Sequence, residues 1–482
     1  MLRRLSALVA FGMFMFPAIL AGRILEVGPT HALTLPSQAA AIASDGDTVF
    51  IAAGEYVDAA RWSADNLLIR GVGGYAHVRD RTWGGKAIWV IQGNNTTVEW
   101  VEFSGARVQD RNGAGIRQEG RHLTLRHCSF HHNEMGILAG NDTGSHILFE
   151  YCIFANNGYG DGYSHNVYIN HVGRFTMRFC YSHDAVIGHN VKSRAHETWL
   201  LYNRFDEADG GNTSREIDIP NGGLAVIVGN TLDHGVNTDN SNLLGFGHEG
   251  YSNPRRSLYV VNNTFVTARS AGGFVTLPSA AAADTVLLYN NIFAGRATPL
   301  VGAASRVDSA ANIAARDLAA PGFRNSDEGD FTLLSSSPAI GAGTDPGSVD
   351  GFGLLPVYEY VHPAGRAPRV HRNGIDCGAF AYQPPLTAHP PPHAAATTLR
   401  ITSIAPNPVR DMAQITVALS RAASLRLLVT DLHGRCVIPA RSLTRSAGEH
   451  TLPLDVRALP PGLHFLVIES SRERAISPLL VR

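Results

Sequence analysis

Lysine is almost missing from this chain of 482 residues, which contains two lysines, Lys86 and Lys192, against 38 arginines. Charged residues make up 17% of the sequence, and the formal net charge is −1. This balance gives no bulk attraction toward nucleic acid or an anionic membrane, so we expect no nucleic-acid partner. Recognition of a charged ligand must therefore come from a local group of charges.

Cysteine is also scarce. An odd number of widely spaced cysteines is not the disulfide framework of a small exported domain. The first three occupy one position of the repeat described below, where a small thiol fits a buried slot without a polar partner. The five are Cys128, Cys152, Cys180, Cys377 and Cys436.

The sequence has one long apolar run, over residues 5–20. It follows Arg3 and Arg4 and precedes Ala21-Gly22. A basic start, a short apolar run and small residues predict a secretory signal peptide over residues 1–21. A membrane anchor is the alternative, for which the run is short. We expect the mature chain to be a monomer without a membrane span.

A short phrase of alternating apolar residues recurs from about residue 98. A period of about 25 residues, with short β segments and Gly/Asn turns, predicts a parallel β-helix, and parallel crossovers are overwhelmingly right-handed. An inward asparagine at a bend can bond its amide to the asparagine of the next coil. The key position holds Cys128, Cys152, Cys180, Asn203, Asn230, Asn263 and Asn291.

A short helix is expected behind Ser37, followed by the phrases Gly46–Ile51 and Gly54–Tyr56. With the repeat, they resemble the right-handed parallel β-helix proteins of the pectate-lyase-like superfamily. The resemblance spans residues 24–382 and implies that fold, with the helix closing the apolar end of the solenoid.

Residues 383–398 form a proline-rich linker. Residues 399–482 show short alternating strands, which predict a small β-sandwich and an all-β chain. Three phrases resemble the C-terminal sorting domain of the type IX secretion system, which implies that machinery as a partner and a secreted or surface-attached bacterial protein. A carbohydrate-binding or immunoglobulin-like module is the alternative. The phrases are Ala405–Pro408, Asp431–Arg435 and Leu459–His464.

Three segments with a strand period follow one another at the repeat distance: 164–170, 188–194 and 215–221. If their central apolar residues point inward, the outward residues form a polar grid with a spacing of about 4.8 Å between coils. We predict this grid to be the active site. Its columns are Asn166, Asn190 and Glu216; Tyr168, Lys192 and Asp218; and Asn170, Arg194 and Pro220.

Lys192 stands in the middle of the grid, although the chain otherwise uses arginine. Arginine stays protonated, whereas a lysine beside another cation can become a base. Lys192-Ser193 is similar to the base motif of the alginate lyase and chondroitinase B family. That resemblance implies β-elimination on a uronate polysaccharide, with Tyr168 as proton donor and Arg194 or His189 as carboxylate clamp or acid. Further substrate contacts are expected from His165, Asn166, Asn170, Asn190, Asn221 and Glu249.

Other uses of the grid stay open. Glu216 and Asp218, with Asp161, are candidate ligands of Ca²⁺, which prefers carboxylate oxygens. The same pair of carboxylates could serve glycoside hydrolysis. C5-epimerisation begins with the same proton abstraction as a lyase. A non-catalytic glycan-binding rod would instead use the charges as a ladder of surface ion pairs.

Overall fold

The computed structural model describes residues 22–207, 211–238, 240–280, 283–372, 374–384, 399–430, 436–470 and 474–481. The predicted signal peptide, most of the predicted linker and the phrase Asp431–Arg435 lie outside these residues. The chain divides into two compact units, and the boundary in the sequence lies between Gln383 and Pro384. Among the described residues, no helix is long and apolar enough to cross a membrane.

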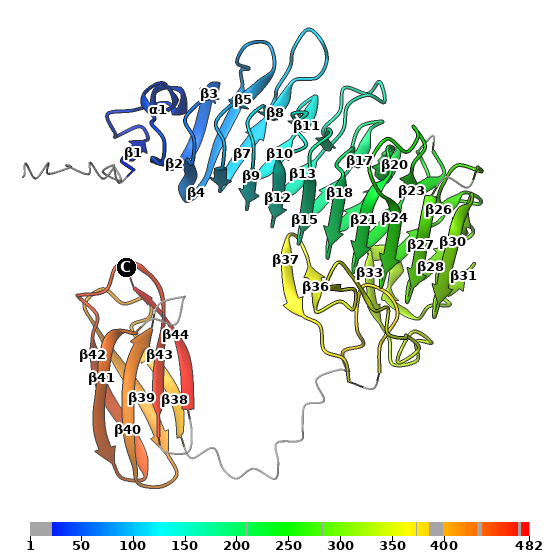
Figure 1. The fold of residues 1–482 in the computed structure, drawn as a ribbon. Coiled ribbons are helices and arrows are strands. Elements are labelled where there is room, and N and C mark those ends of the chain that lie inside the picture. Colours follow the sequence, from blue (N-terminus) through cyan, green and yellow to red (C-terminus); the bar gives the residue numbers. More distant parts are fainter. Residues whose placement is uncertain are drawn as a thin grey trace, which may run out of the picture. The chain divides into compact units, whose positions relative to one another are not determined.

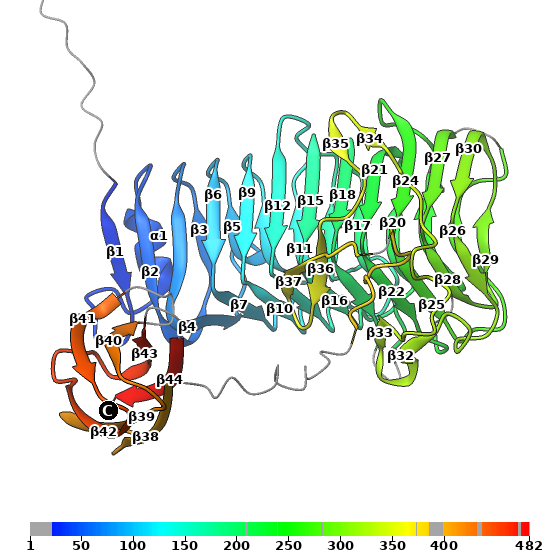
Figure 2. The same cartoon turned by 90° about the horizontal axis from the view of Figure 1, so that it is seen from below.

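The first unit is a parallel β-helix with three faces (Figures 1 and 2). Each coil places one strand on each face, and each strand pairs in parallel with its counterpart in the next coil. The predicted parallel β-helix is thereby confirmed.

Two faces belong to one 21-stranded sheet. The strands of its first face are β1 (Ile24–Val27), β2 (Thr48–Asp58), β4 (Leu68–Asp80), β6 (Thr96–Glu99), β9 (Leu123–Arg126), β12 (His146–Glu150), β15 (Arg174–Arg178), β18 (Glu197–Leu201), β21 (Gly223–Val228), β24 (Arg256–Val261), β27 (Ala283–Tyr289) and β30 (Ala304–Ala310). Its second face continues from the long strands β2 and β4 with β7 (Val101–Ser104), β10 (Ser129–His131), β13 (Ile153–Ala155), β16 (Tyr181–His183), β19 (Arg204–Asp206), β22 (Thr231–His234), β25 (Thr264–Thr267), β28 (Ile292–Gly295) and β31 (Ile313–Ala315).

The third face is a separate ten-stranded sheet and carries the predicted grid. Its strands are β3 (Ala60–Trp62), β5 (Ala87–Ile91), β8 (Ala114–Gln118), β11 (Met135–Ala139), β14 (Val167–Ile169), β17 (His189–Ser193), β20 (Arg215–Ile219), β23 (Asn242–Phe246), β26 (Gly273–Thr276) and β29 (Thr298–Val301).

The turn between the first and second faces explains the repeated Cys/Asn position. The residue before the repeated position has a positive φ, which turns the chain sharply; examples are His127 (+51°) and Tyr202 (+57°). The next side chain points into the core, where the backbone N–H of Asn203 donates to Oδ1 of Asn230 at 2.8 Å, and Asn230 repeats the contact to Asn263 at 2.9 Å. Cys128, Cys152 and Cys180 are buried free thiols, as predicted.

The helix α1 (Pro36–Ile42) lies at the N-terminal end of the solenoid, beside β1, β2 and β3 (Figure 1). It begins one residue before the predicted cap, Ser37, and its N-cap is Leu35. Close by, the buried carboxylate of Asp47 accepts hydrogen bonds from the backbone N–H groups of Arg23 and Ser44, at 2.7 and 2.9 Å. The first coil is thereby tied to the turn after α1.

Asp47→Asn is expected to lower stability in a pH-dependent way. Hydrogen bonds from Arg23 lower the pKa of Asp47 from 3.8 to about 2. A lowered carboxyl pKa means that the stabilisation is complete above pH 3.8 and is lost as the pH falls through about 2. Thermal unfolding should show a loss of about 1 kcal/mol for the variant at neutral pH. The difference from wild type should shrink markedly as the pH falls to about 2; an equal difference at neutral pH and near pH 2 would contradict this.

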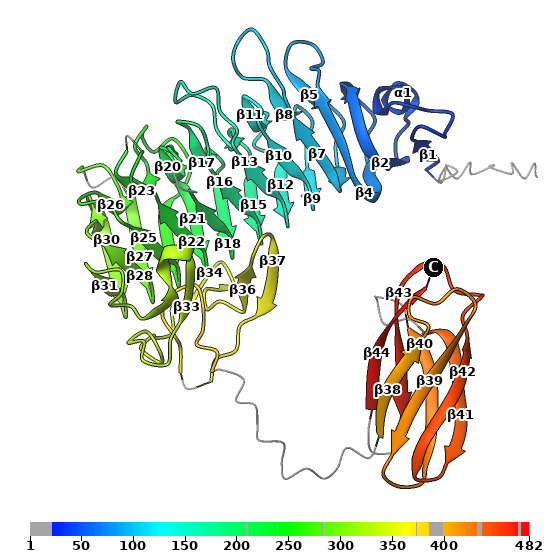
Figure 3. The same ribbon diagram turned by 180° about the vertical axis from the view of Figure 1, so that it is seen from behind.

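The chain after the last coil runs back along the outside of the first two faces (Figure 3). The Tyr202 hydroxyl accepts a hydrogen bond from N–H of Val357 at 3.2 Å, and Asn262 Nδ2 donates to the carbonyl of Asp376 at 2.8 Å. The elements of this segment are β32 (Phe323–Asn325), a 3₁₀ turn (Ser326–Glu328), β33 (Asp330–Leu333), β34 (Ser348–Val349), β35 (Phe352–Gly353), β36 (Tyr358–Val361) and β37 (Gly365–Pro368).

The second unit is a small β-sandwich, as predicted. Both sheets are antiparallel; one has three strands and the other has four. Apolar residues of both sheets form its own core. The strands are β38 (Leu399–Ala405), β39 (Met412–Leu419) and β42 (Gly448–Asp455), and β41 (Cys436–Arg445), β40 (Ala423–Thr430), β43 (Gly462–Glu469) and β44 (Arg474–Val481).

Candidate functional site

The middle column of the predicted grid forms as expected on the outer surface of the third face. Tyr168 pairs in register with Lys192, and Lys192 pairs with Asp218. The alternate residues Val191 and Ile217 point into the core. Short parallel strands in register therefore place a phenol, an amine and a carboxylate side by side in three consecutive coils.

Lys192 and Arg194 share one carboxylate. Lys192 Nζ lies 3.0 Å from Oε1 of Glu249, and an Nη atom of Arg194 lies 2.6 Å from Oε2 of the same residue. The two cationic side chains are 12% and 16% exposed, whereas Glu249 is 46% exposed. Partial burial opposes ionisation of Glu249, but the hydrogen bonds from Lys192 and Arg194 outweigh it and lower its pKa. We call Lys192, Arg194 and Glu249 the carboxylate clamp.

Arg194 also orients Tyr168. Nε of Arg194 donates to the Tyr168 hydroxyl at 3.0 Å, and Nη1 donates to Oδ1 of Asn221. Because the phenol oxygen accepts this hydrogen bond, its own proton is free to point elsewhere. Tyr168 and Asn221 therefore lie beside the clamp, as predicted.

Asp218 lies beneath Lys192 and is almost fully buried, with 3% of its side chain exposed. Its Oδ2 lies 3.5 Å from Lys192 Nζ, and its Oδ1 accepts a hydrogen bond from Arg215 at 2.9 Å. Gly245 is its partner on β23, where an added Cβ would lie 3.0 Å from Oδ1. Arg215 was not predicted as a site residue; its place at the start of the third grid segment was the available signal.

The two predicted histidines are buried beside this cluster. The rings of His165 and His189 stack with centroids 4.7 Å apart. The backbone N–H of His189 donates to Nδ1 of His165 at 3.0 Å. Burial, with the charge of Lys192 as a further cause, lowers the pKa of both rings well below 6.5. Both rings are therefore neutral at neutral pH, so His189 cannot supply a positive charge, and of the two candidates only Arg194 can pair with a substrate carboxylate as a cation.

The predicted outward orientation of the first column is wrong. Asn166, Asn190 and Glu216 are fully buried and form an internal ladder. Asn166 Nδ2 donates to Oδ1 of Asn190 at 2.8 Å, and Asn190 Nδ2 donates to Oε2 of Glu216 at 2.5 Å. These side chains turn into the corner between the second and third faces, since Asn190 Nδ2 also donates to the carbonyl of Asp206, the last residue of β19. Asn166 and Asn190 thus support the wall and do not reach a substrate.

The predicted calcium ligands do not converge. Among the described residues, neither of the two groups of at least three close metal-ligating side chains contains Asp161 or Asp218. Glu216 points into the corner of the coil, whereas Asp218 faces outward beneath Lys192. Asp161 accepts hydrogen bonds within its own loop, from N–H of Tyr163 at 3.0 Å.

Asn170 and Tyr163 lie in the segments that flank β14. Asn170 is half-buried, and its Oδ1 accepts a hydrogen bond from N–H of His171 at 3.0 Å, so its side chain is turned back on its own backbone. Tyr163 is 83% exposed in the loop before β14, where its ring is available to a sugar.

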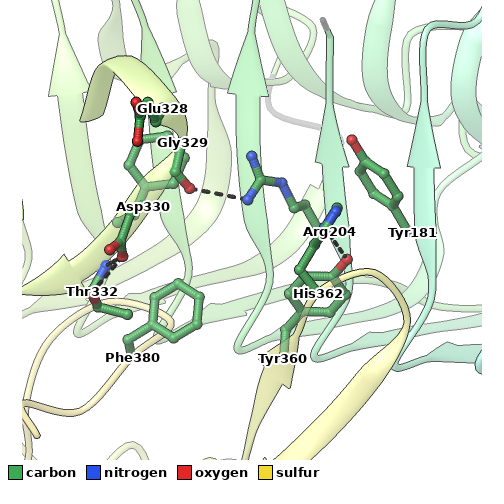
Figure 4. A pocket seen from close by; sticks show the side chains of 10 residues that line it. Tyr181, Arg204, Glu328, Gly329, Asp330, Thr332, Tyr360, His362 and Phe380 are labelled. Carbon is green, nitrogen blue, oxygen red and sulfur yellow. Dashed lines mark hydrogen bonds between the residues drawn. The ribbon is translucent and has the colours of Figure 1, made fainter. Parts of the chain in front are cut away.

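A cavity of about 490 Å³ lies elsewhere, over β16 and β19 of the second face (Figure 4). Arg204 crosses it and donates to the carbonyl of Gly329 at 3.0 Å, between the rings of Tyr181 and Phe331. Tyr360 and His362 come from the returning C-terminal segment. This cavity could not be predicted, because its walls come from coils and a returning segment that are separated by more than a hundred residues.

Comparisons with known proteins agree with both units. Residues 403–482 match the family model described as the secretion system C-terminal sorting domain. Among solved structures seven chains match, including the crystal structure of pectate lyase Pel9A, with a TM-score of 0.53 and 14% identity over 76% of this chain and 98% of that chain. No curated protein matches the sequence.

The sorting domain confirms the prediction of a secreted or cell-surface bacterial protein and implies the type IX secretion machinery as its export partner. At 14% identity, the likeness to pectate lyase Pel9A concerns the fold alone.

Proposed function

We propose that this protein is a secreted polysaccharide lyase that cleaves a uronate-containing glycan by β-elimination. The carboxylate clamp carries the proposal. Two cations on the outer face of the β-helix converge on a single carboxylate that is itself half exposed. A uronate carboxylate that replaced Glu249 would meet the same two cations, with Tyr168 beside it. The likeness to a pectate lyase fold agrees with this reading.

Neutralisation of the substrate carboxylate by Arg194 makes the proton on C5 of the uronate acidic. Displacement of Glu249 breaks the nearer ion pair of Lys192 Nζ, at 3.0 Å, and the unprotonated amine is the form that serves as the base. Lys192 Nζ then takes the C5 proton, the C4–O4 bond breaks, and its electrons leave with O4. Tyr168 gives its hydroxyl proton to O4, and a C4–C5 double bond remains in the product.

Product analysis tests this reaction class. The full chain is incubated with a panel of uronate polymers in deuterated water, and the products are followed by mass spectrometry and NMR. A lyase gives an unsaturated uronide at each new non-reducing end. Addition of water at each cut would show a hydrolase, and deuterium at C5 without cleavage would show an epimerase; either result would overturn the proposal.

A non-catalytic glycan-binding surface is the second candidate. It is favoured by the low exposure of Lys192 and Arg194 and by their pairing with Asp218 and Glu249, which resembles a structural ion-pair network. Such a surface would bind the polymers without changing them.

Glu249→Gln is expected to lower KM for a uronate polymer by about fivefold, because it removes an internal competitor worth about 1 kcal/mol for the substrate carboxylate. The value of kcat should change less. Steady-state kinetics checks this, with Glu119→Gln as the matched control, since Glu119 pairs with Lys86, the other lysine, at 2.5 Å. A raised KM in Glu249→Gln would show that Glu249 binds substrate instead of competing with it.

A further inference from the structure

A second group of ionisable side chains lies on the inner side of the same wall. Glu207 follows β19, Glu216 belongs to β20, and His234 ends β22. Their side chains are 1%, 0% and 0% exposed. One potential ligand atom from each lies within 4.8 Å of the others. None of the steps proposed for the lyase uses these residues.

The hydrogen bonds around His234 place the proton of a neutral ring on Nε2 and leave Nδ1 unprotonated. Nε2 lies 2.8 Å from the carbonyl oxygen of Asn240, which can only accept, so Nε2 carries a proton. The lone pair of Nδ1 then faces Oε1 of Glu216 at 3.0 Å and Oε1 of Glu207 at 3.7 Å. Asn190 holds the other oxygen of Glu216. With the His234 ring neutral and both carboxylates ionised, three acceptor atoms thus converge, and only an added proton or cation can join them.

Among the residues that the structure describes, the Glu207 carboxylate makes no hydrogen bond. Neither carboxylate oxygen has a hydrogen-bond partner there, and both are buried. Its carboxylate fits against Gly235, where an added Cβ would lie 2.3 Å from Oε2. A buried ionised carboxylate without a partner is costly, so the arrangement calls for a positive charge or a proton.

We propose that Glu207, Glu216 and His234 form a buried site for a divalent transition-metal cation, such as Zn²⁺. Two carboxylate oxygens and an imidazole nitrogen are a donor set that suits this class of ion. Nδ1 of His234 would bind the ion while Nε2–H is held by a backbone carbonyl, which is the usual outer partner of a metal-bound histidine.

The site is closed to solvent, so the ion would have a structural role. It would join residues of three successive second- and third-face strands and fix the start of β20, two residues before Asp218. The competing occupant is a proton: burial, with the charge of Glu216 as a further cause, raises the pKa of Glu207 to about 8. The two states differ in metal content, which can be measured without any substrate.

The full chain, purified without a histidine tag, is dialysed against a chelator, incubated with Zn²⁺ and analysed by elemental mass spectrometry and thermal unfolding. We expect about one bound Zn²⁺ per chain and a rise in Tm of about 3–6 °C on addition of the ion. Glu207→Gln keeps the shape of the side chain and should lose both the ion and the rise in Tm. Gly235→Ala should do the same, because its methyl group displaces the Glu207 carboxylate.

The matched control is His131→Ala, which disrupts the other group of potential ligands, His77, Glu102 and His131. It should keep the Zn²⁺ and its effect on Tm. A wild-type chain that takes up no Zn²⁺, or an ion that survives Glu207→Gln but is lost in His131→Ala, would overturn the proposal. Circular dichroism of each variant shows that the loss does not reflect unfolding.

Discussion

Lys192→Ala is expected to lower the rate of double-bond formation in a uronate polymer by about 10²–10⁴-fold, the usual contribution of a general base. Lys192→Arg should lose nearly as much, because arginine keeps the charge but stays protonated. The rate is followed through the ultraviolet absorbance of the unsaturated product. Lys86→Ala is the control, since Lys86 pairs with Glu119 and lies outside the carboxylate clamp.

The two Lys192 variants separate chemistry from binding. If Lys192→Arg kept the wild-type rate, position 192 would supply a positive charge and not a base. The proposed mechanism would then be wrong. The Tm of each variant is measured beside its rate, because Lys192→Ala also removes a cation from Asp218, whose side chain is only 3% exposed.

Phe130→Ala is expected to destabilise the β-helix by about 3–5 kcal/mol, the range for a large aromatic side chain removed from a core. Phe130 is fully buried and stacks between Phe103 and Phe154, with ring centroids 5.0 and 4.9 Å apart. Its removal leaves a cavity that short strands, tied on both sides to neighbouring coils, cannot close. Urea unfolding measures the loss.

Tyr163→Ala is the matched control for this variant, because the ring of Tyr163 is 83% exposed. Its effect on stability should stay within about 0.5 kcal/mol. A loss below about 1 kcal/mol for Phe130→Ala would show that the stacked rings do not determine the stability of these coils.

The repeat made most of the fold predictable. The buried position that runs from Cys128 to Asn291 recurs because each coil must turn through a residue with positive φ and then satisfy its backbone groups. Such a requirement leaves the same residue types at the same spacing, so the parallel β-helix could be inferred without the structure. The sorting domain was predictable for a different reason, since its phrases are specific.

The candidate site was predictable only in the middle of each strand. Tyr168, Lys192 and Asp218 follow the strand alternation, and they were placed correctly. Alternation fails at the corner, where Asn190 and Glu216 turn inward, and Asn190 bonds the carbonyl of Asp206 at the end of β19. The repeated asparagine, at Asn166 and Asn190, could have indicated an internal ladder. The buried ladder predicted at the turn between the first and second faces shows the same repetition.

Contacts that do not follow the strand alternation, or that involve the segment after the last coil, could not be predicted. Glu207 follows a strand in one coil and meets His234 of the next, and nothing in their spacing shows that both side chains turn into the same corner. The segment that crosses the outside of the coils likewise contributes Tyr360 and His362 to the cavity over β16 and β19.

The dependence of the reaction on the substrate carboxylate tests the central claim most directly. The wild-type chain is given a uronate polymer and the same polymer after chemical reduction of its carboxyl groups to alcohols, and formation of the unsaturated product is measured for both. We predict product from the uronate polymer and none from the reduced one, which offers no carboxylate for Arg194 to neutralise and therefore no acidic C5 proton for Lys192 to take. Binding of the uronate polymer without any unsaturated product would contradict the account.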